Sequence, residues 1–288
     1  MRDYVIFTDS GCDIAPAKLA EWGVPYKSLT FRFDGEEKEY ENGEMDTKTF
    51  YNRMREGGVA KTAAVNKETF AVAFREIAKE GNDILYIGFS SGLSTTYNSA
   101  RLAALEVGEE YPDIKILAVD TLAASAGQGL LIYLATEKKA AGATVEECAA
   151  YMEEIKLNMC HWFTVDDLVY LKRGGRVSAT AAFFGNALGI KPVMHVDNEG
   201  HLVNVMKVRG RRTAINTMAD KLVETALDAK NGKIYISHGD CREDAEYLAS
   251  VIAEKCGGQV EIITDVGAVI GAHSGPGTLA LFFLGSER

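Results

Sequence analysis

The chain has few of the residues that mark metal clusters and disulfide frameworks. Its 288 residues include five cysteines, at positions 12, 148, 160, 241 and 256, and no two of them form a C-x-x-C pair. No cysteine or histidine group has zinc-ligand spacing. An odd number of cysteines in a long chain favours reduced thiols over a disulfide framework. We therefore predict no metal and a cytoplasmic location.

Long apolar runs are also missing. No stretch approaches the ~18 consecutive apolar residues of a membrane span. The opening residues, MRDYVIFTDS, begin a strand pattern rather than a signal peptide. The net charge of −10 argues against a nucleic acid or an anionic membrane as partner. These absences predict a protein with no integral membrane segment and no nucleic-acid partner.

The first half of the chain alternates between strand and helix patterns. Apolar strand patterns at 4–7, 26–33, 84–89 and 114–119 are separated by helical patterns. Asn66 is a predicted N-cap, and Asp13 is expected to cap a helix that ends at Trp22. This alternation predicts an α/β domain with a doubly wound, mostly parallel sheet. Ligands of such sheets lie beyond the carboxyl ends of the strands.

The pattern changes after a predicted helix at 144–159. A short strand at 162–165 is followed by a hairpin over 190–208, which turns at 197–200. Strands and helices then interleave to the end of the chain, which predicts an α+β second domain. We place the boundary near residue 160, which gives domains 1–160 and 161–288.

Gly88-Phe89-Ser90-Ser91-Gly92 fits the G-x-S-x-G pattern of a nucleophile elbow, after a predicted strand and before a predicted helix. In a serine hydrolase or esterase, Ser90 would attack and His273 would be the base, oriented by Asp120 or Asp265. The chain order matches that of α/β-hydrolases. However, no HGGG-type oxyanion loop precedes Ser90.

The same segment also fits an anion site. Ser90, Ser91, Ser94, Thr95 and Thr96 place five hydroxyls in seven residues at a predicted helix N-terminus, where backbone N–H groups and the helix dipole attract anions. A helix cap uses one hydroxyl. A capped helix whose spare hydroxyls face water is the remaining interpretation.

His273 lies in a glycine-rich segment that we expect to be a loop between apolar stretches. A histidine there can pair with a carboxylate or hydrogen-bond to nearby backbone. In a different segment, Lys172, Arg173 and Arg176 flank a Gly-Gly turn. They form either a solvated basic loop or a docking patch for an acidic partner or a phosphate. The neighbouring Phe183-Phe184 pair is expected in the core.

Six segments occur in order over nearly the whole chain: FTDSGCDI, GFSSGLSTTYNSA, VDTLAASAGQGLL, LKRGGRVS, LGIKPVMHVDNEGHL and IGAHSGPGTLALFFLG. Together they resemble the DegV family of bacterial fatty-acid-binding proteins, the FakB type. The resemblance implies a two-domain cytosolic protein that encloses one long-chain fatty acid between its domains. It implies no cofactor and no catalysis by the chain itself. A partner fatty-acid kinase would phosphorylate the bound carboxylate for phospholipid synthesis.

The resemblance also implies site residues. Thr62, Ser91 and His273 match the family's contacts to the carboxylate, and the acyl tail would lie in an apolar tunnel. Ser90, Ser94 and Thr95 are expected as further hydroxyls beside the head group, and Ser274 stands where the family often has an apolar residue. Lys172, Arg173 and Arg176 fall where the kinase would dock. Ser91 is therefore expected to bind the ligand without attacking it, and the hydrolase with Ser90 remains the alternative.

Overall fold

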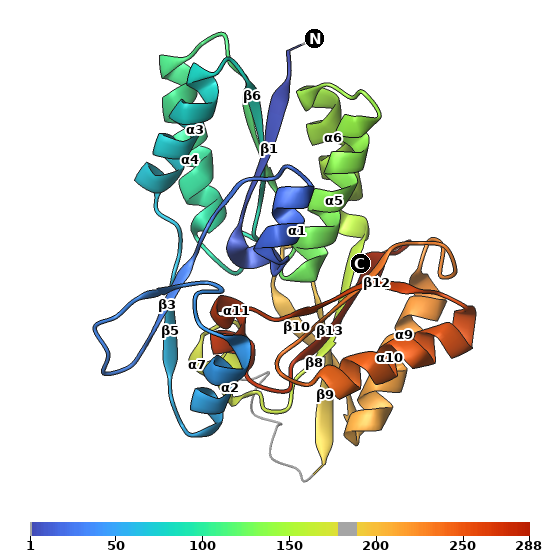
Figure 1. Ribbon diagram of the computed structural model, residues 1–288. Coiled ribbons are helices and arrows are strands. Elements are labelled where there is room, and N and C mark those ends of the chain that lie inside the picture. The colour runs from blue at the N-terminus through green and yellow to red at the C-terminus, as the bar shows by residue number, and fades with distance from the viewer. Residues whose placement is uncertain (1, 178–188) are drawn as a thin grey trace.

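The computed structural model describes residues 2–177 and 189–288, so Phe183 and Phe184 lie outside the described residues. The upper half of Figure 1 is built on a four-stranded parallel sheet in the order β2-β1-β6-β7. Its strands are β1 (Tyr4–Asp9), β2 (Tyr26–Lys27), β6 (Asp83–Gly88) and β7 (Ile116–Asp120). This confirms the predicted parallel sheet.

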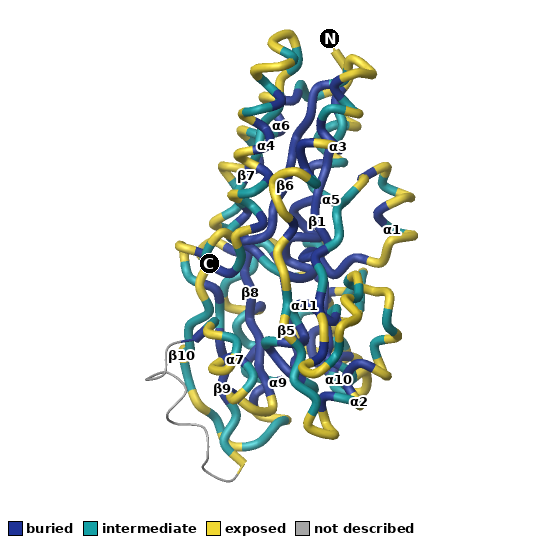
Figure 2. The backbone as a smooth tube through the Cα atoms, turned by 90° about the vertical axis from the view of Figure 1, so that its left-hand side faces the viewer, coloured by how far each residue is buried: buried dark blue, intermediate teal, exposed yellow. Residues whose placement is uncertain are grey.

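Helices cover both faces of this sheet (Figure 1). They are α3 (Lys67–Lys79) and α4 (Thr96–Glu110) on one face, and α5 (Ala126–Ala140) and α6 (Val145–Ile155) on the other. Because both faces are covered, β1 and β6 are almost wholly buried (Figure 2). Asn66 caps α3 as predicted, since its side chain accepts a hydrogen bond from Thr69 N.

The expectation that Asp13 caps a helix is wrong. A 3-10 turn, η1 (Ser10–Cys12), follows β1, and α1 (Pro16–Glu21) starts later, with Ala15 at the N-cap. Asp13 has a φ of 50°, in the left-handed region that its short polar side chain tolerates. Its carboxylate is bonded to distant parts of the chain instead.

The lower half of Figure 1 contains a six-stranded sheet in the order β10-β9-β8-β13-β11-β12. Its strands are β8 (Met159–Thr164), β9 (Ile190–Val196), β10 (Leu202–Arg209), β11 (Ile234–His238), β12 (Val260–Asp265) and β13 (Leu279–Leu284). β11 and β12 pair in parallel, and the other neighbours pair antiparallel. α9 (Arg211–Thr225) and α10 (Arg242–Cys256) cover one face. The predicted hairpin turn at 197–200 is confirmed.

The single strand expected over 26–33 is two strands in different sheets. β2 stays in the parallel sheet, while β3 (Thr30–Phe33) joins β4 (Tyr40–Glu41) and β5 (Ala60–Ala63) in a small antiparallel sheet. This sheet and α2 (Thr47–Arg55) pack against α11 (Ala268–Ser274), near the C-terminus, beside the lower half in Figure 1. The domain boundary near residue 160 stays a prediction.

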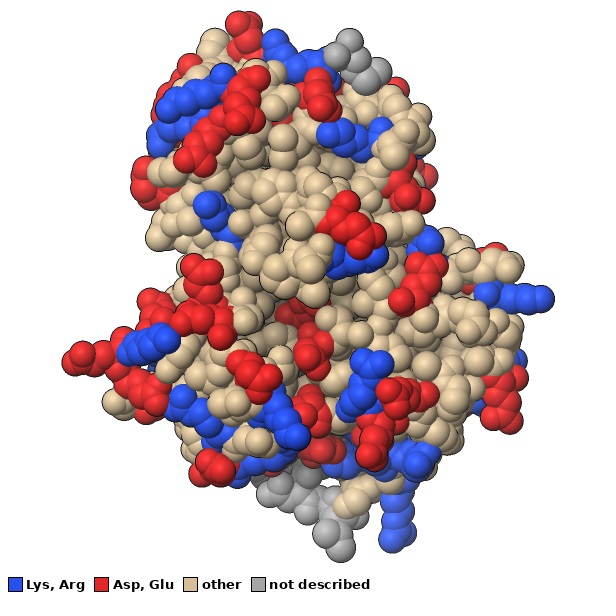
Figure 3. Space-filling view, viewed as in Figure 1, with Lys and Arg blue, Asp and Glu red and all other residues tan. Residues whose placement is uncertain are grey.

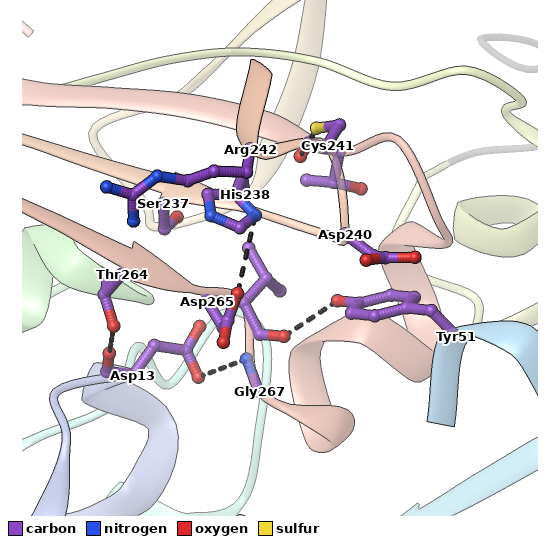
Figure 4. Close-up of polar contacts among 12 residues, drawn as sticks. Asp13, Tyr51, Ser237, His238, Asp240, Cys241, Arg242, Thr264, Asp265 and Gly267 are labelled. Carbon is purple, nitrogen blue, oxygen red and sulfur yellow. Dashed lines mark hydrogen bonds and ion pairs between the residues drawn. The ribbon is translucent and has the colours of Figure 1, made fainter. Parts of the chain in front are cut away.

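Asp13 connects the two halves of the molecule (Figure 4). Its Oδ2 accepts a hydrogen bond from the Ser125 hydroxyl at 2.6 Å, and its Oδ1 accepts one from Gly267 N at 3.0 Å. Its backbone carbonyl accepts a further bond from the Thr264 hydroxyl at 2.9 Å. Burial raises the pKa of the Asp13 carboxyl to about 7. A buried carboxyl thus joins the segment that follows β1 and η1 to the segment that leads into α11.

Apart from a few buried aspartates such as Asp13, the charged side chains lie mostly at the surface, where acidic and basic groups are interspersed on the face that Figure 3 shows. Several form exposed ion pairs, such as that between Lys18 and Glu21 at 2.8 Å. Pairs of this kind add little to stability. Among the helices of the described residues, none is both long and apolar enough to cross a membrane.

The raised pKa of Asp13 predicts a pH-dependent stability. Folding favours the protonated carboxyl. Its contribution to the free energy of unfolding is therefore full below about pH 4 and is lost as the pH rises through about 7. The side chain of Asp13→Asn stays neutral at every pH. Between these limits, the free energy of unfolding of the variant should therefore rise relative to that of the wild type by up to about 4 kcal/mol. Urea unfolding at several pH values measures this gain. Asp113→Asn, which removes a charge from an exposed site, is the control. A constant difference between Asp13→Asn and wild type would contradict the prediction.

Candidate functional site

A cavity of about 540 Å³ lies between the two halves. This volume falls within the range of small-molecule sites. Its floor is the inner face of the six-stranded sheet, where Phe163, Ala280 and Phe282 share one side because they are register partners or alternate residues. Its other walls include apolar side chains from several elements: Leu29, Phe89, Leu93, Leu171, Val196, Leu202, Val266, Val269 and Ile270.

Thr62 and His273 meet at the cavity wall. The Thr62 hydroxyl lies 2.8 Å from Nε2 of His273, although 211 residues separate the two. Thr62 is the register partner of Phe31, and opposite residues of an antiparallel pair share a face. Phe31 is fully buried in the core that includes α11, so Thr62 faces α11 as well. His273 lies in the last turn of this helix, not in the loop expected from the sequence.

His273 is held as a neutral ring. Burial, and then the neighbouring Arg176 cation, lower its pKa to about 4. In the described part of the chain, its Nδ1 has no hydrogen-bond partner. Gly174 packs against this nitrogen so closely that a Cβ atom would overlap it. A side chain at position 174 would therefore force the imidazole ring of His273 to move.

The loop between β6 and α4 supplies the hydroxyls. Ser91, Ser94 and Thr95 all line the cavity, together with Thr62 and His273. Ser91 N donates to Asp120 Oδ1 at 3.1 Å, which fixes the loop backbone. Thr95 is the N-cap residue of α4, but its side chain makes no capping bond. Its hydroxyl is therefore available for a ligand.

Ser90 lies behind this wall. It is fully buried, and its hydroxyl donates to the Gly200 carbonyl at 2.9 Å and accepts from Gly92 N at 3.2 Å. Ser90 is not among the described residues that line the cavity. The structure thus separates the two adjacent serines: Ser91 faces the cavity, and Ser90 ties the loop to the hairpin at 197–200.

The groups that a serine hydrolase needs are not assembled. His273 is bonded to Thr62 through Nε2, while the Ser90 hydroxyl is bonded to a backbone carbonyl. Asp120 accepts bonds from backbone N–H groups. Asp265 lies 3.5 Å from Nδ1 of His238 rather than beside His273 (Figure 4). The geometry therefore does not support nucleophilic attack by Ser90.

Asp9 is a positioning residue that the sequence analysis missed. Its buried carboxylate accepts hydrogen bonds from the Tyr86 hydroxyl at 2.6 Å, Phe89 N at 3.0 Å and Gly11 N at 2.9 Å. It thereby anchors the start of the loop that carries Ser91. The signal in the sequence is an acidic residue at the end of a buried strand, in FTDSG, to which the sequence analysis gave no role of its own.

The basic segment divides into two parts. Lys172 and Arg173 are exposed in the last turn of α7 (Val169–Arg173), and Arg173 lies over the Tyr170 ring at 5.7 Å. Neither side chain forms an ion pair within the described residues. Arg176, expected at a docking surface, lines the cavity instead, and its guanidinium donates to the backbone carbonyls of Leu93 and Gly174.

Three side chains at the hairpin turn, Asp197, Glu199 and His201, lie close enough together to hold a metal ion. Glu199 and His201 are exposed, and exposed acidic groups are common without an ion. We therefore assign no metal to them.

The chain matches known proteins over its full length. The family described as "Uncharacterised protein, DegV family" matches residues 3–286. A DegV domain-containing protein of Clostridium perfringens is 43% identical, with 100% of this chain and 99% of that protein covered. A solved DegV family protein from Thermus thermophilus, described as binding fatty acid, has a TM-score of 0.88 and 29% identity, with 99% and 100% covered.

A stearic-acid-binding protein from Eubacterium ventriosum has the same TM-score of 0.88, with 25% identity and 98% of each chain covered. The shared fold points to a binding protein rather than a catalyst. With a family match that spans nearly every residue and a relative above 40% identity, the chain belongs to the DegV family.

Proposed function

We propose that this chain binds one long-chain fatty acid in the cavity and presents its carboxylate to a fatty-acid kinase, without catalysing a reaction itself. The observation that carries the proposal is the division of the cavity: a largely apolar floor and walls, and a cluster of exposed or half-buried hydroxyls with a neutral histidine at one side. The fatty acids in the solved structures of relatives support the same ligand class.

The tail supplies most of the binding free energy. Each buried methylene contributes ~0.8 kcal/mol, so a sixteen-carbon tail offers roughly 12 kcal/mol before the costs of association. The floor and walls described above provide the apolar contacts. Because these contacts are not directional, they hold the tail without fixing which end lies outward.

The head group fixes the orientation. An ionised carboxylate costs several kcal/mol to bury unless donors replace its water. Ser91 and Thr95 are exposed residues of the cavity wall, whereas Thr62 and His273 are half-buried. These four residues therefore mark the end of the cavity that opens to solvent. The permanent charge of Arg176, also in the wall, favours an anion there.

A kinase needs access to this carboxylate. Gly175 and Arg176 line the cavity, so the exposed Lys172 and Arg173 lie a few residues from the proposed head-group end. Exposed cations that form no ion pair with the described residues suit an acidic surface on the kinase. Under this proposal the chain works in the cytoplasm, and the acyl phosphate passes to phospholipid synthesis.

Ser91→Ala should weaken binding of octadecanoic acid by about 1–3 kcal/mol, because it removes a donor to a partly buried carboxylate. Calorimetry on delipidated protein measures the affinity. The matched control is Ser90→Ala, one residue away. It should change affinity less, but lower the free energy of unfolding, since it leaves the Gly200 carbonyl without its partner. Equal losses of affinity in both variants would contradict the assignment of Ser91.

The methyl ester of octadecanoic acid should bind more weakly than the free acid. The ester lacks the negative charge that Arg176 and the hydroxyl cluster favour, and its methyl group adds bulk beside His273. The same titration measures both ligands. If acid and ester bound equally, tail contacts alone would account for recognition, and hydrolysis of the ester would restore the hydrolase alternative.

Arg173→Ala should leave fatty-acid affinity almost unchanged and slow acyl-phosphate formation by the cognate kinase, with an effect that shrinks as salt is added. Arg212→Ala is the matched control. Arg212, on α9, is also exposed and also lies over a tyrosine ring, that of Tyr247 on α10. A slower reaction in both variants, or in neither, would argue against docking at Arg173.

A further inference from the structure

Only one of the two ring nitrogens of His273 has a hydrogen-bond partner among the described residues. Nε2 lies 2.8 Å from the Thr62 hydroxyl. Nδ1 is closed off from solvent and forms no hydrogen bond with that part of the chain. Gly174 packs against Nδ1, and the Gly174 carbonyl accepts a bond from Arg176. The position of the ring proton is therefore not fixed by a partner on each side.

A neutral imidazole carries one proton, on either nitrogen. His273 is neutral near pH 7, because burial and the Arg176 cation lower its pKa to about 4. With the proton on Nδ1, a buried N–H group would point at Gly174 without an acceptor, and Nε2 would accept the Thr62 proton. With the proton on Nε2, His273 donates to Thr62, and the buried Nδ1 keeps a lone pair. The two tautomers thus give the Thr62 hydroxyl opposite roles.

The charge of Arg176 favours the proton on Nε2. Either tautomer leaves Nδ1 without a hydrogen bond, so the electrostatic surroundings of this nitrogen decide between them. Arg176 is bonded to the carbonyl of Gly174, the same residue that packs against Nδ1, so its cation lies near that side of the ring. A nearby positive charge attracts a lone pair and repels the positive end of an N–H dipole. Nδ1 is therefore the nitrogen that stays unprotonated.

The tautomer decides what Thr62 offers to the cavity, which its residue lines. A hydroxyl has one proton and two acceptor positions. If Thr62 accepts from Nε2, its proton is free for a ligand, because its side chain forms no other hydrogen bond within residues 2–177 and 189–288. If Thr62 donated to Nε2, only lone pairs would face the ligand, and these repel carboxylate oxygens.

We infer that His273 is a positioning residue, which donates its Nε2 proton to Thr62 and thereby turns the Thr62 hydroxyl proton toward the head group of the ligand. Thr62 is then a donor only, and its natural partner is a group that only accepts, such as an ionised carboxylate. The inference rests on the proposed function, since it assumes a carboxylate at this wall. It adds that His273 acts through Thr62 and that the fatty acid is held as its anion.

His161 is an internal reference, because its partners require the opposite tautomer. Its Nδ1 lies 2.9 Å from the Met159 carbonyl, which only accepts, and its Nε2 accepts a bond from Ala124 N at 3.3 Å. Burial lowers the pKa of this ring well below its usual range, so His161 is also neutral. Like His273, it lines the cavity.

Nitrogen NMR of delipidated protein with isotope-labelled histidine rings distinguishes a protonated from an unprotonated ring nitrogen. Near pH 7, the proton of His161 should be on Nδ1 and that of His273 on Nε2. His273→Gln identifies the signals of His273 by their loss. A proton on Nδ1 of His273, or a mixture of both tautomers, would overturn the inference.

A double-mutant cycle tests whether His273 acts through Thr62. Thr62→Val and His273→Leu should each weaken octadecanoic acid binding by about five- to tenfold, the loss of one hydrogen bond. The double variant should bind within about twofold of Thr62→Val, because His273 then has no hydroxyl to orient. His273→Gln, which keeps an N–H donor, should bind more tightly than His273→Leu when Thr62 is present and equally when Thr62 is valine.

The outcomes separate the inference from the proposed function. If the wild type binds no octadecanoic acid, the proposed function fails, and the inferred bond from Thr62 to the ligand fails with it. If the wild type binds the acid but the losses in the double variant multiply, His273 acts independently of Thr62, and the inference alone fails. Should a His273 variant not fold, the spectrum of the wild type still decides the tautomer.

Discussion

A carboxylate inside a protein must have its lost water replaced by fixed donors, and this requirement organises the proposed site. The donors come from three places: β5, the loop after β6, and the last turn of α11. The small sheet of β3, β4 and β5 holds Thr62 against α11, and Asp9 holds the loop that carries Ser91. Much of the fold that lies outside the two main sheets therefore serves to bring these groups together.

The local elements of the fold follow from the sequence, because their signals are local. The cap at Asn66 and the hairpin at 197–200 depend on residues within one turn of each other. The small sheet was not predicted from the sequence, because a two-residue strand such as β4 is too short to show an alternation of apolar and polar residues. α11 was also missed: its AVIGAHS sequence contains a glycine and two β-branched residues, which favour helices poorly, and it is stabilised by packing in the core that contains Phe31 and Phe50.

The candidate site was likewise predicted only in part from the sequence. The family resemblance brought together Thr62, Ser91 and His273, and the structure places all three in one cavity wall. The choice between Ser90 and Ser91 depends on a backbone carbonyl 110 residues away, which no local pattern contains. The inward turn of Arg176 likewise depends on the Leu93 carbonyl. Contacts at such separations are set by tertiary packing, so a single sequence does not reveal them.

The packing of the β3–β5 segment on α11 has a consequence for protein synthesis. Residues 30–63 leave the ribosome long before their partner helix, α11, is made. β13, which lies between β8 and β11 in the larger sheet, is made later still. Contacts this distant in sequence form late in folding. A nascent chain that has not yet reached α11 and β13 therefore lacks part of the wall and floor of the cavity.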